Sequence, residues 1–128
     1  MKPGSRIAVI DVDDPGFVAQ LAERTDDITM AKPWKDSDTI FLGAESVRAL
    51  SVLPAFRKLL KPNGSIWVVH RKGKDASLKD VEVFRAAKVA GLVDTKVASF
   101  SATHTAERLV IPVAKRPRQK PPATARRT

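Results

Sequence analysis

The sequence contains no cysteine and no tyrosine, and only 5% of its residues are aromatic. Without cysteine, the chain cannot form a disulfide, present a thiolate nucleophile or bind zinc through cysteine sulfur. The low aromatic content also argues against a stacking platform for single-stranded nucleic acid. Thiol chemistry and cysteine-ligated zinc are therefore excluded, and the absence of cysteine fits a reducing cytoplasm.

Long hydrophobic runs are also missing, since no apolar stretch approaches the roughly 20 residues of a membrane span. The first residues, Met1 to Arg6, lead into a strand-like segment without a secretory pattern. We therefore expect a cytoplasmic protein with no membrane partner. A length of 128 residues, with 43% hydrophobic and 29% charged residues, suits a single globular domain.

The net charge of +9 comes largely from the last residues of the chain. Residues 115–128 contain no acid, and removing their six positive charges from +9 leaves +3. These six are Lys115, Arg116, Arg118, Lys120, Arg126 and Arg127. We therefore divide the chain into a domain at 1–114 and a basic, proline-rich tail at 115–128, whose composition is typical of disorder. Such a tail favours weak, non-specific binding to nucleic acid, and the alternative is an appendage that binds nothing specifically.

The hydrophobic pattern predicts alternating strands and helices. Strands are expected at 6–12, 28–30, 38–43, 66–69, 92–100 and 108–113, and helices at 15–24, 45–60 and from 77 to about 90. The order β-α-β-β-α-β-α-β-β predicts an α/β fold of three-layer, Rossmann-like type. The sheet should be mostly parallel, with an antiparallel hairpin at its C-terminal end.

Local signals refine these boundaries. Asp14 followed by Pro15 is a favourable helix start, and Pro54 suggests a kink or a second short helix. The segment Lys61-Pro62-Asn63-Gly64 predicts a tight turn before a strand at Ile66–Val69 that is buried on both faces. Ser77 and Asp80 form a capping pattern for the third helix, and Gly91 lies where that helix should end.

A resemblance to known proteins follows from the segment at 53–69, LPAFRKLLKPNGSIWVV. It resembles the helix, turn and fifth strand of class I S-adenosylmethionine-dependent methyltransferases. More broadly, the chain is similar to a small bacterial family of unknown function whose members resemble shortened methyltransferase domains. Matching pieces include Lys2-Pro3-Gly4, Pro15-Gly16-Phe17, the segment at 91–97 and Arg108-Leu109-Val110. The resemblance implies a methyltransferase-like fold and makes S-adenosylmethionine the cofactor to consider.

The segment after the first strand departs from the methyltransferase pattern. Where methyltransferases have a Gly-rich turn, this chain has the segment at 11–16, DVDDPG, with one glycine and three carboxylates. Three acids would repel a pyrophosphate, which argues against a dinucleotide. The cationic sulfonium of S-adenosylmethionine tolerates acids, but the missing glycines weaken the case for that cofactor.

Ligands of open α/β sheets bind beyond the carboxyl ends of the strands. If the first, third and fourth strands are neighbours, a small molecule would meet Asp11, Asp13, Gly43, Glu45, His70, Arg71 and Lys72. The alternative is that these residues are a helix cap and solvated loops. His70 is suited to general base chemistry near neutral pH. The sequence indicates neither a nucleophile nor clustered acids beside it, so we assign no catalytic residue and no metal site.

Three other side chains have competing interpretations. Trp67 is expected in the core, and His104 in the loop of the last hairpin. Trp34 either stacks on a base or adenine ring or packs on its own domain. Taken together, the sequence favours a non-catalytic small-ligand or protein-binding domain of unidentified ligand. The alternatives are an active S-adenosylmethionine-dependent methyltransferase and an accessory protein that associates with nucleic acid through its tail.

Overall fold

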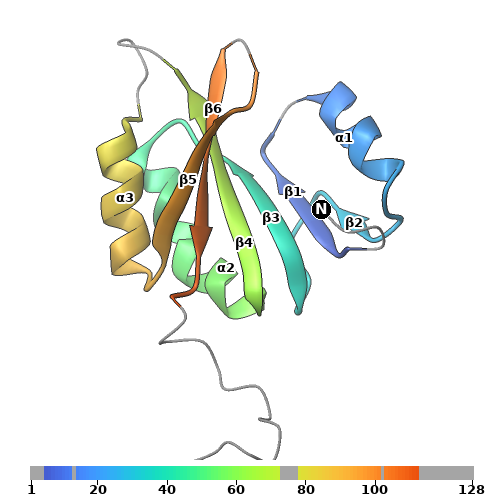
Figure 1. Cartoon of the computed structure of the whole chain (residues 1–128), viewed down its shortest axis with the longest axis horizontal. Coiled ribbons are helices and arrows are strands. Elements are labelled where there is room, and N and C mark those ends of the chain that lie inside the picture. The colour runs from blue at the N-terminus through green and yellow to red at the C-terminus, as the bar shows by residue number, and fades with distance from the viewer. Residues whose placement is uncertain (1–4, 13, 73–77, 102, 113–128) are drawn as a thin grey trace, which may run out of the picture.

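The computed structural model describes residues 5–12, 14–72, 78–101 and 103–112 (Figure 1). Its strands are β1 (Ile7–Ile10), β2 (Ile28–Thr29), β3 (Ser37–Gly43), β4 (Leu60–Arg71), β5 (Val93–Ser99) and β6 (His104–Val110). Its helices are α1 (Pro15–Ala22), the 3-10 helix η1 (Val47–Val52), α2 (Leu53–Leu59) and α3 (Asp80–Val89). No helix in these described ranges is long and apolar enough to cross a membrane. The predicted division at residue 114 falls outside the described residues and stays a prediction.

The strands form one six-stranded sheet in the order β2-β1-β3-β4-β6-β5. Strand β1 is parallel to β2 and β3, and β3 is parallel to β4. Strand β6 is antiparallel to both β4 and β5. The predicted α/β class, with a mostly parallel sheet and a closing antiparallel hairpin, is confirmed. The arrangement also places β1, β3 and β4 side by side, as the predicted ligand site requires.

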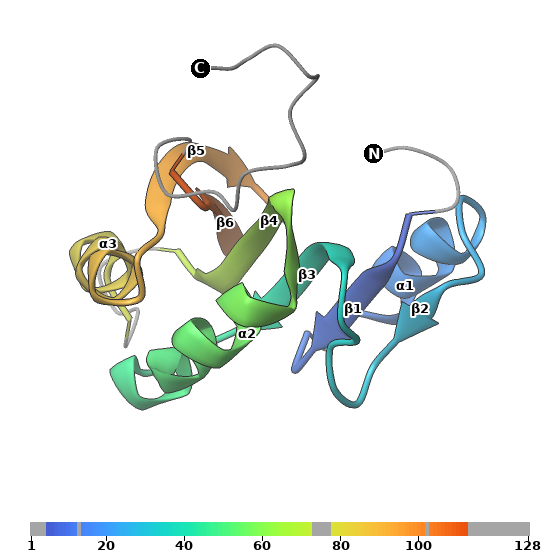
Figure 2. The ribbon, with the colours of Figure 1, turned by 90° about the horizontal axis from the view of Figure 1, so that it is seen from below.

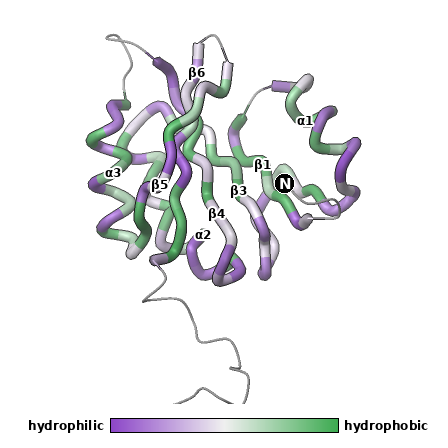
Figure 3. Tube along the Cα trace, viewed as in Figure 1, coloured by the Kyte–Doolittle hydropathy of each residue, from purple (hydrophilic) through white to green (hydrophobic). Residues whose placement is uncertain are grey.

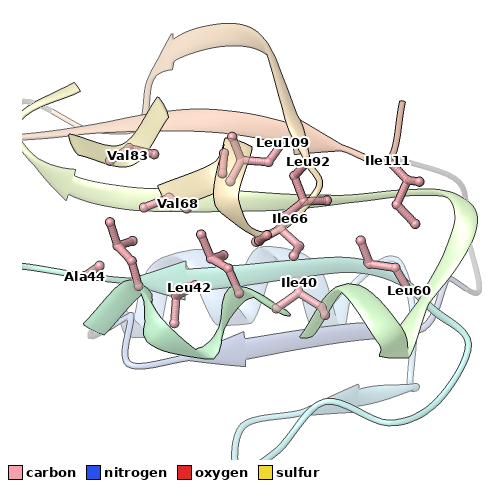
Figure 4. Close-up of a cluster of buried hydrophobic side chains, with 14 of the residues drawn as sticks. Ile40, Leu42, Ala44, Leu60, Ile66, Val68, Val83, Leu92, Leu109 and Ile111 are labelled. Atoms are coloured by element: carbon pink, nitrogen blue, oxygen red, sulfur yellow. The ribbon is translucent and has the colours of Figure 1, made fainter. Parts of the chain in front are cut away.

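The larger hydrophobic core lies between the sheet and helices η1, α2 and α3. Inward-facing residues of the strands, such as Ile40, Ile66, Val68 and Leu109, pack with Val83 of α3 (Figure 4). All five side chains have essentially no exposed surface. In Figure 3, green hydrophobic stretches run along β1 and β4, whereas α1 and α3 include purple hydrophilic stretches. This face of the sheet is therefore fully covered.

In the described part of the chain, the opposite face of the sheet is covered by α1 and by Phe100, which follows β5. Figure 2 shows α1 beside β1 and β2, away from α2 and α3. Leu21 packs with Val9, and the Phe17 ring meets Phe41 and Phe100 edge-on, with ring centroids 4.8 Å apart in each pair. Because α1 has only two turns, much of this face remains open. The third layer of the fold is thus incomplete.

Several local predictions hold. The Asp14 carboxylate caps α1 by accepting a hydrogen bond from the Phe17 backbone N–H at 3.0 Å. Pro54 lies in the first turn of α2, directly after η1, so the 45–60 segment does consist of two short helices. Gly91 ends α3 with a φ of 79°, the left-handed conformation that glycine adopts readily.

The predicted turn at 61–64 lies within β4 rather than before it, and a Cβ built on Gly64 would lie 3.1 Å from the Lys61 carbonyl oxygen three residues earlier. Leu60 pairs with Ser37 and Ser65 pairs with Thr39, so residues 61–64 form an irregular bulge opposite Asp38. Positive φ angles in the described part occur only at Asp11, Asp36 and Gly91, so residues 61–64 are not left-handed. Gly64 instead permits close approach, since a Cβ there would lie 3.0 Å from two backbone carbonyl oxygens of β3.

Two further boundaries differ from the prediction. Helix α3 begins at Asp80, and the Glu82 carboxylate accepts a hydrogen bond from the Lys79 backbone N–H at 2.9 Å. Ser77 itself lies outside the described residues. Strand β6 begins at His104 instead of 108. The loop expected at 101–107 is therefore shorter, because its residues 104–107 pair with β4. On the other side of β6, the register of β5 shifts between Asp94 and Lys96.

Candidate functional site

The carboxyl ends of β1 and β3 surround a small cavity. Asp11, Gly43 and Glu45 line it, together with Asp14 and His104, and its volume is about 170 Å³. The sequence-predicted residues of the first two strand ends therefore do share one rim of the sheet. Asp13 lies outside the described residues.

The backbone closes this rim between β1 and β3. Asp11 adopts a φ of 58° and directs its carbonyl group over Gly43. A Cβ built on Gly43 would lie only 2.0 Å from the Asp11 carbonyl oxygen, so this crossing requires glycine. Pockets for small-molecule ligands typically occupy about 300–1,000 Å³. The rim cavity is smaller than this range, and Asp11, Val12 and Asp14 of the segment after β1 are among the residues that line it.

His104 faces this cavity from β6 and pairs with Glu45. Its Nε2 atom lies 3.6 Å from Glu45 Oε2, and its Nδ1 lies 2.8 Å from the Thr103 hydroxyl. The Glu45 side chain is 49% exposed, so the pair is a solvent-screened contact. His104 was expected in a loop, but it is the first residue of a paired strand.

His70 lies on the other side of the sheet, where it joins two acids. Its side chain is 2% exposed, and Nε2 lies 2.5 Å from Glu107 Oε2 and 3.4 Å from Asp80 Oδ1. The other ring nitrogen, Nδ1, lies 3.2 Å from the backbone carbonyl oxygen of Arg71. The prediction that His70 lacks clustered acids is therefore wrong. Glu107 was assigned to a loop and Asp80 to a cap, which concealed the cluster from sequence reasoning.

Burial and mutual contact shift the titration of this pair. Burial raises the pKa of the Glu107 carboxyl, and the hydrogen bond and charge of His70 offset only part of that effect. Burial lowers the pKa of His70, but the hydrogen bond and charge of Glu107 outweigh it, and the pKa of His70 is raised. Glu107 has no exposed surface, and its Oε1 has no hydrogen-bond partner within the described part of the chain. The cluster thus contains an unsatisfied buried carboxylate oxygen.

The two predicted cations after β4 lie at the mouth of a cavity beside His70. Arg71 and Lys72 line this space of about 310 Å³ with His70 and Asp80. The Lys72 ammonium donates a hydrogen bond to the Ser99 hydroxyl at 2.7 Å. The predicted ligand site is therefore divided between two cavities, one lined by Asp11, Gly43 and Glu45 and the other by His70, Arg71 and Lys72.

A third cavity is a groove on the open sheet face, with a volume of about 550 Å³. Its walls include the aromatic side chains of Phe17, Phe41, Trp67 and Phe100. Its polar lining comes from Ser5, Asp38, Thr39, Asn63, Ser65, Ser99 and Arg108. Sequence reasoning missed this groove because it placed Trp67 in the core, whereas the ring is only partly buried. An apolar strand residue cannot reveal from sequence alone that its covering layer is incomplete.

The remaining candidates do not join these cavities. Trp34 is 47% exposed, and the Arg6 guanidinium lies over its ring, 5.9 Å from the centroid. This contact is with the protein's own domain, the second of the two interpretations of Trp34. The six cations predicted to meet nucleic acid, residues 115–127, lie outside the described residues, so that prediction stays open.

Solved structures with a similar fold are methyltransferases. An S-adenosylmethionine-dependent methyltransferase from Aquifex aeolicus superposes with a TM-score of 0.66 at 13% identity, covering 86% of this chain and 84% of that one. A TehB-like methyltransferase from Corynebacterium glutamicum gives 0.57 at 10% identity, covering 87% and 82%. The match to an O-methyltransferase of neocarzinostatin biosynthesis, solved with S-adenosyl-L-homocysteine, has a TM-score of 0.56 at 14% identity and covers 80% of this chain but 41% of that protein.

At these identities the likeness establishes the fold alone. No curated protein matches the sequence. A family model described as a protein of unknown function, DUF3052, matches residues 33–113. This span contains β3 to β6 and the His70 cluster, but not the first strand and its acidic loop. The chain therefore belongs to the DUF3052 family and has the Rossmann-like fold of class I methyltransferases.

Proposed function

We propose that this protein is a non-catalytic binding domain that holds a small molecule in the groove between α1 and the open sheet face. The observation that carries the proposal is the groove itself. Its volume of about 550 Å³ falls within the range typical of ligand pockets, and its aromatic walls are interrupted by a few polar groups. The rim cavity of about 170 Å³, where the fold would place a cofactor, falls below that range.

The lining indicates the chemistry of the ligand. Four aromatic rings suit a planar apolar body, which would stack or pack edge-on against them. The two charged residues of the groove differ in their surroundings. Asp38 is paired with the Lys61 ammonium at 3.1 Å, whereas Arg108 donates to the neutral hydroxyl of Thr95 at 3.2 Å. The groove thus favours an aromatic molecule with an anionic group, which Arg108 would bind.

The closed rim argues against methyl transfer as the function. Catalysis would require S-adenosylmethionine beyond β1 and β3, where the Asp11 carbonyl group lies over Gly43. The Gly-rich turn that allows a cofactor to approach the backbone is replaced by an acidic segment with one glycine. These two features support a domain that keeps the methyltransferase fold without the reaction.

The test uses 1-anilinonaphthalene-8-sulfonate, an anionic aromatic probe whose fluorescence rises on binding. We expect saturable binding to the native protein and a loss of at least tenfold in affinity for Ala98→Trp. Ala98 lines the groove and is partly exposed, so a Trp side chain there would fill it. The matched control is Val89→Trp on α3, because Val89 is 82% exposed and borders a separate apolar cavity of about 260 Å³. A loss of binding in the control only, or in neither variant, would contradict the proposal.

An active methyltransferase is the second candidate, favoured by the fold and by the meeting of Asp11, Gly43 and Glu45 at one rim. Titration calorimetry with S-adenosylmethionine and S-adenosylhomocysteine separates the two. We expect no heat of binding at millimolar ligand. Saturable binding that is lost in Asp11→Asn, which keeps a residue tolerant of positive φ, would instead support the enzyme.

A further inference from the structure

We propose that His70, Asp80 and Glu107 form a binding site for a divalent first-row metal ion, with Zn²⁺ as the probe. This site lies on the helix-covered side of the sheet and does not depend on the groove or on the rim. The three residues come from β4, the start of α3 and β6, so the fold assembles them from segments that are distant in sequence.

The fold brings three potential ligand atoms close together. One imidazole nitrogen and two carboxylate oxygens lie within 4.8 Å of one another. Zn²⁺ binds imidazole nitrogen and carboxylate oxygen at about 2.0–2.2 Å, which places tetrahedral ligands roughly 3.3 Å apart. The 3.4 Å between His70 Nε2 and Asp80 Oδ1 already fits, and the 2.5 Å between His70 Nε2 and Glu107 Oε2 must widen. Asp80 is 57% exposed and can adjust as an ion enters.

The second ring nitrogen of His70 makes a contact of the kind that orients metal-binding histidines. Nδ1 lies 3.2 Å from the Arg71 backbone carbonyl oxygen, which can only accept a hydrogen bond. If Nδ1 carries the proton, the lone pair of Nε2 points toward Glu107 and Asp80. A backbone carbonyl in this position is the usual partner of a metal-bound imidazole, because it fixes the tautomer and the ring plane.

The buried carboxylate supplies an independent reason for a cation. Glu107 has no exposed surface, and its Oε1 has no hydrogen-bond partner in the described residues. Its Oε2 is paired with His70, so Oε1 is the atom for which a bound cation would provide the missing partner. Two carboxylates and a neutral imidazole carry a charge of −2, which a divalent ion would balance. A proton shared by His70 and Glu107 would leave the acid oxygens less fully satisfied.

The surroundings leave an entry path and an open position. The cavity of about 310 Å³ beside His70 and Asp80 opens between α3 and the end of β4. Three protein ligands with an open fourth position are the arrangement in which zinc retains a water or another exchangeable ligand. Mixed nitrogen and oxygen donors without sulfur favour Zn²⁺ or a similar first-row ion over a soft metal.

The experiment measures Zn²⁺ binding to the full chain after treatment with a chelator. We expect one ion per chain by titration calorimetry. Thermal denaturation should show a Tm rise of roughly 10 °C when free Zn²⁺ exceeds the Kd by about 100-fold. Asp80→Asn is the informative variant, because Asp80 is exposed and its loss should leave the fold intact. Its affinity should fall by more than the roughly 10- to 100-fold that loss of an outer-shell partner costs.

Two further variants keep the result interpretable. His104→Gln removes the other histidine and should bind Zn²⁺ like the native chain. His70→Gln, which retains a polar group beside Glu107, should abolish both the calorimetric signal and the rise in Tm. The proposal is overturned if the native chain does not bind Zn²⁺ at 100 µM. It is equally overturned if Asp80→Asn and His70→Gln bind as tightly as the native chain, or if His104→Gln alone loses binding.

Discussion

Gly43 determines how closely the loop after β1 can approach β3. A Cβ at this position would lie 2.0 Å from the carbonyl oxygen and 2.7 Å from the carbonyl carbon of Asp11. Both atoms belong to the backbone, which cannot rotate away as a flexible side chain can. The contact explains why position 43 requires glycine.

We therefore predict that Gly43→Ala lowers the free energy of unfolding by more than about 2 kcal/mol, because the β1 loop must move or become strained. Urea denaturation measures the change. The control is Gly16→Ala, whose added Cβ meets only the Asp14 carboxylate at 3.5 Å. That variant should leave stability unchanged or raise it by up to about 1 kcal/mol, since alanine is the better helix former. Equal losses in both variants would count against the close contact.

Glu107 shows why a candidate site can be invisible at the level of single residues. The neighbouring sequence, Ser101 to Glu107, is polar and lacks the apolar alternation that indicates a strand. Pairing with β4 nevertheless draws the segment from His104 into the sheet and places Glu107 opposite Val68. The cluster with His70 arises from this pairing, which no local pattern encodes.

At the scale of elements, helix starts and stops were the best-predicted features. Asp14 before Pro15, Pro54 after η1 and Gly91 after α3 act through local backbone geometry, so their positions could be predicted from the residues themselves. The mostly parallel sheet with its closing hairpin also followed from the βα pattern, whereas the order of the strands was only a condition of the predicted ligand site. The turn residues at 61–64 could be predicted, but their place inside β4, as a bulge against β3, could not, because it depends on the pairing of the two strands.

The cap of α1 provides a test at this scale. We predict that Asp14→Ala lowers the free energy of unfolding by about 1 kcal/mol, because the Phe17 N–H loses its side-chain acceptor. Chemical denaturation measures the loss, and Asp26→Ala, an exposed change outside the helix, should stay within about 0.5 kcal/mol of the native protein. Since Phe17 also packs on Phe41 and Phe100, a weakened cap should loosen the groove and reduce probe binding there. A stable variant with native binding would show that packing alone holds α1.

At the scale of the whole molecule, the fold does not determine the function. The sheet, its order and its closing hairpin are those of a methyltransferase-like domain, and the sequence resemblance predicted this. The cavities could not be predicted, because each depends on how far a helix or loop extends over the sheet. A short α1 leaves the groove open, while the loop after β1 closes the rim.

The basic tail at 115–128 leads to a prediction about nucleic acid. We predict that the full chain binds a random-sequence DNA duplex weakly, and that the logarithm of its association constant falls with the logarithm of salt concentration with a slope of up to about −5, because six cations meet phosphates. Fluorescence anisotropy measures the slope. Replacing all six cations of residues 115–128 with glutamine, or ending the chain at residue 114, should abolish binding. If Arg71→Gln with Lys72→Gln removes the binding instead, the tail is not its cause.

The register shift in β5 affects how this protein meets other copies of itself. Strand β5 lies at one edge of the sheet, and its outer backbone groups are not taken up by another strand of the described sheet. Val93 and Val97 are 39% and 52% exposed, so a flat edge here would invite strand pairing between molecules. The irregularity between Asp94 and Lys96 twists that edge and places a charge at its middle. We therefore expect this irregularity, which interrupts pairing inside the molecule, to disfavour strand pairing between molecules as well.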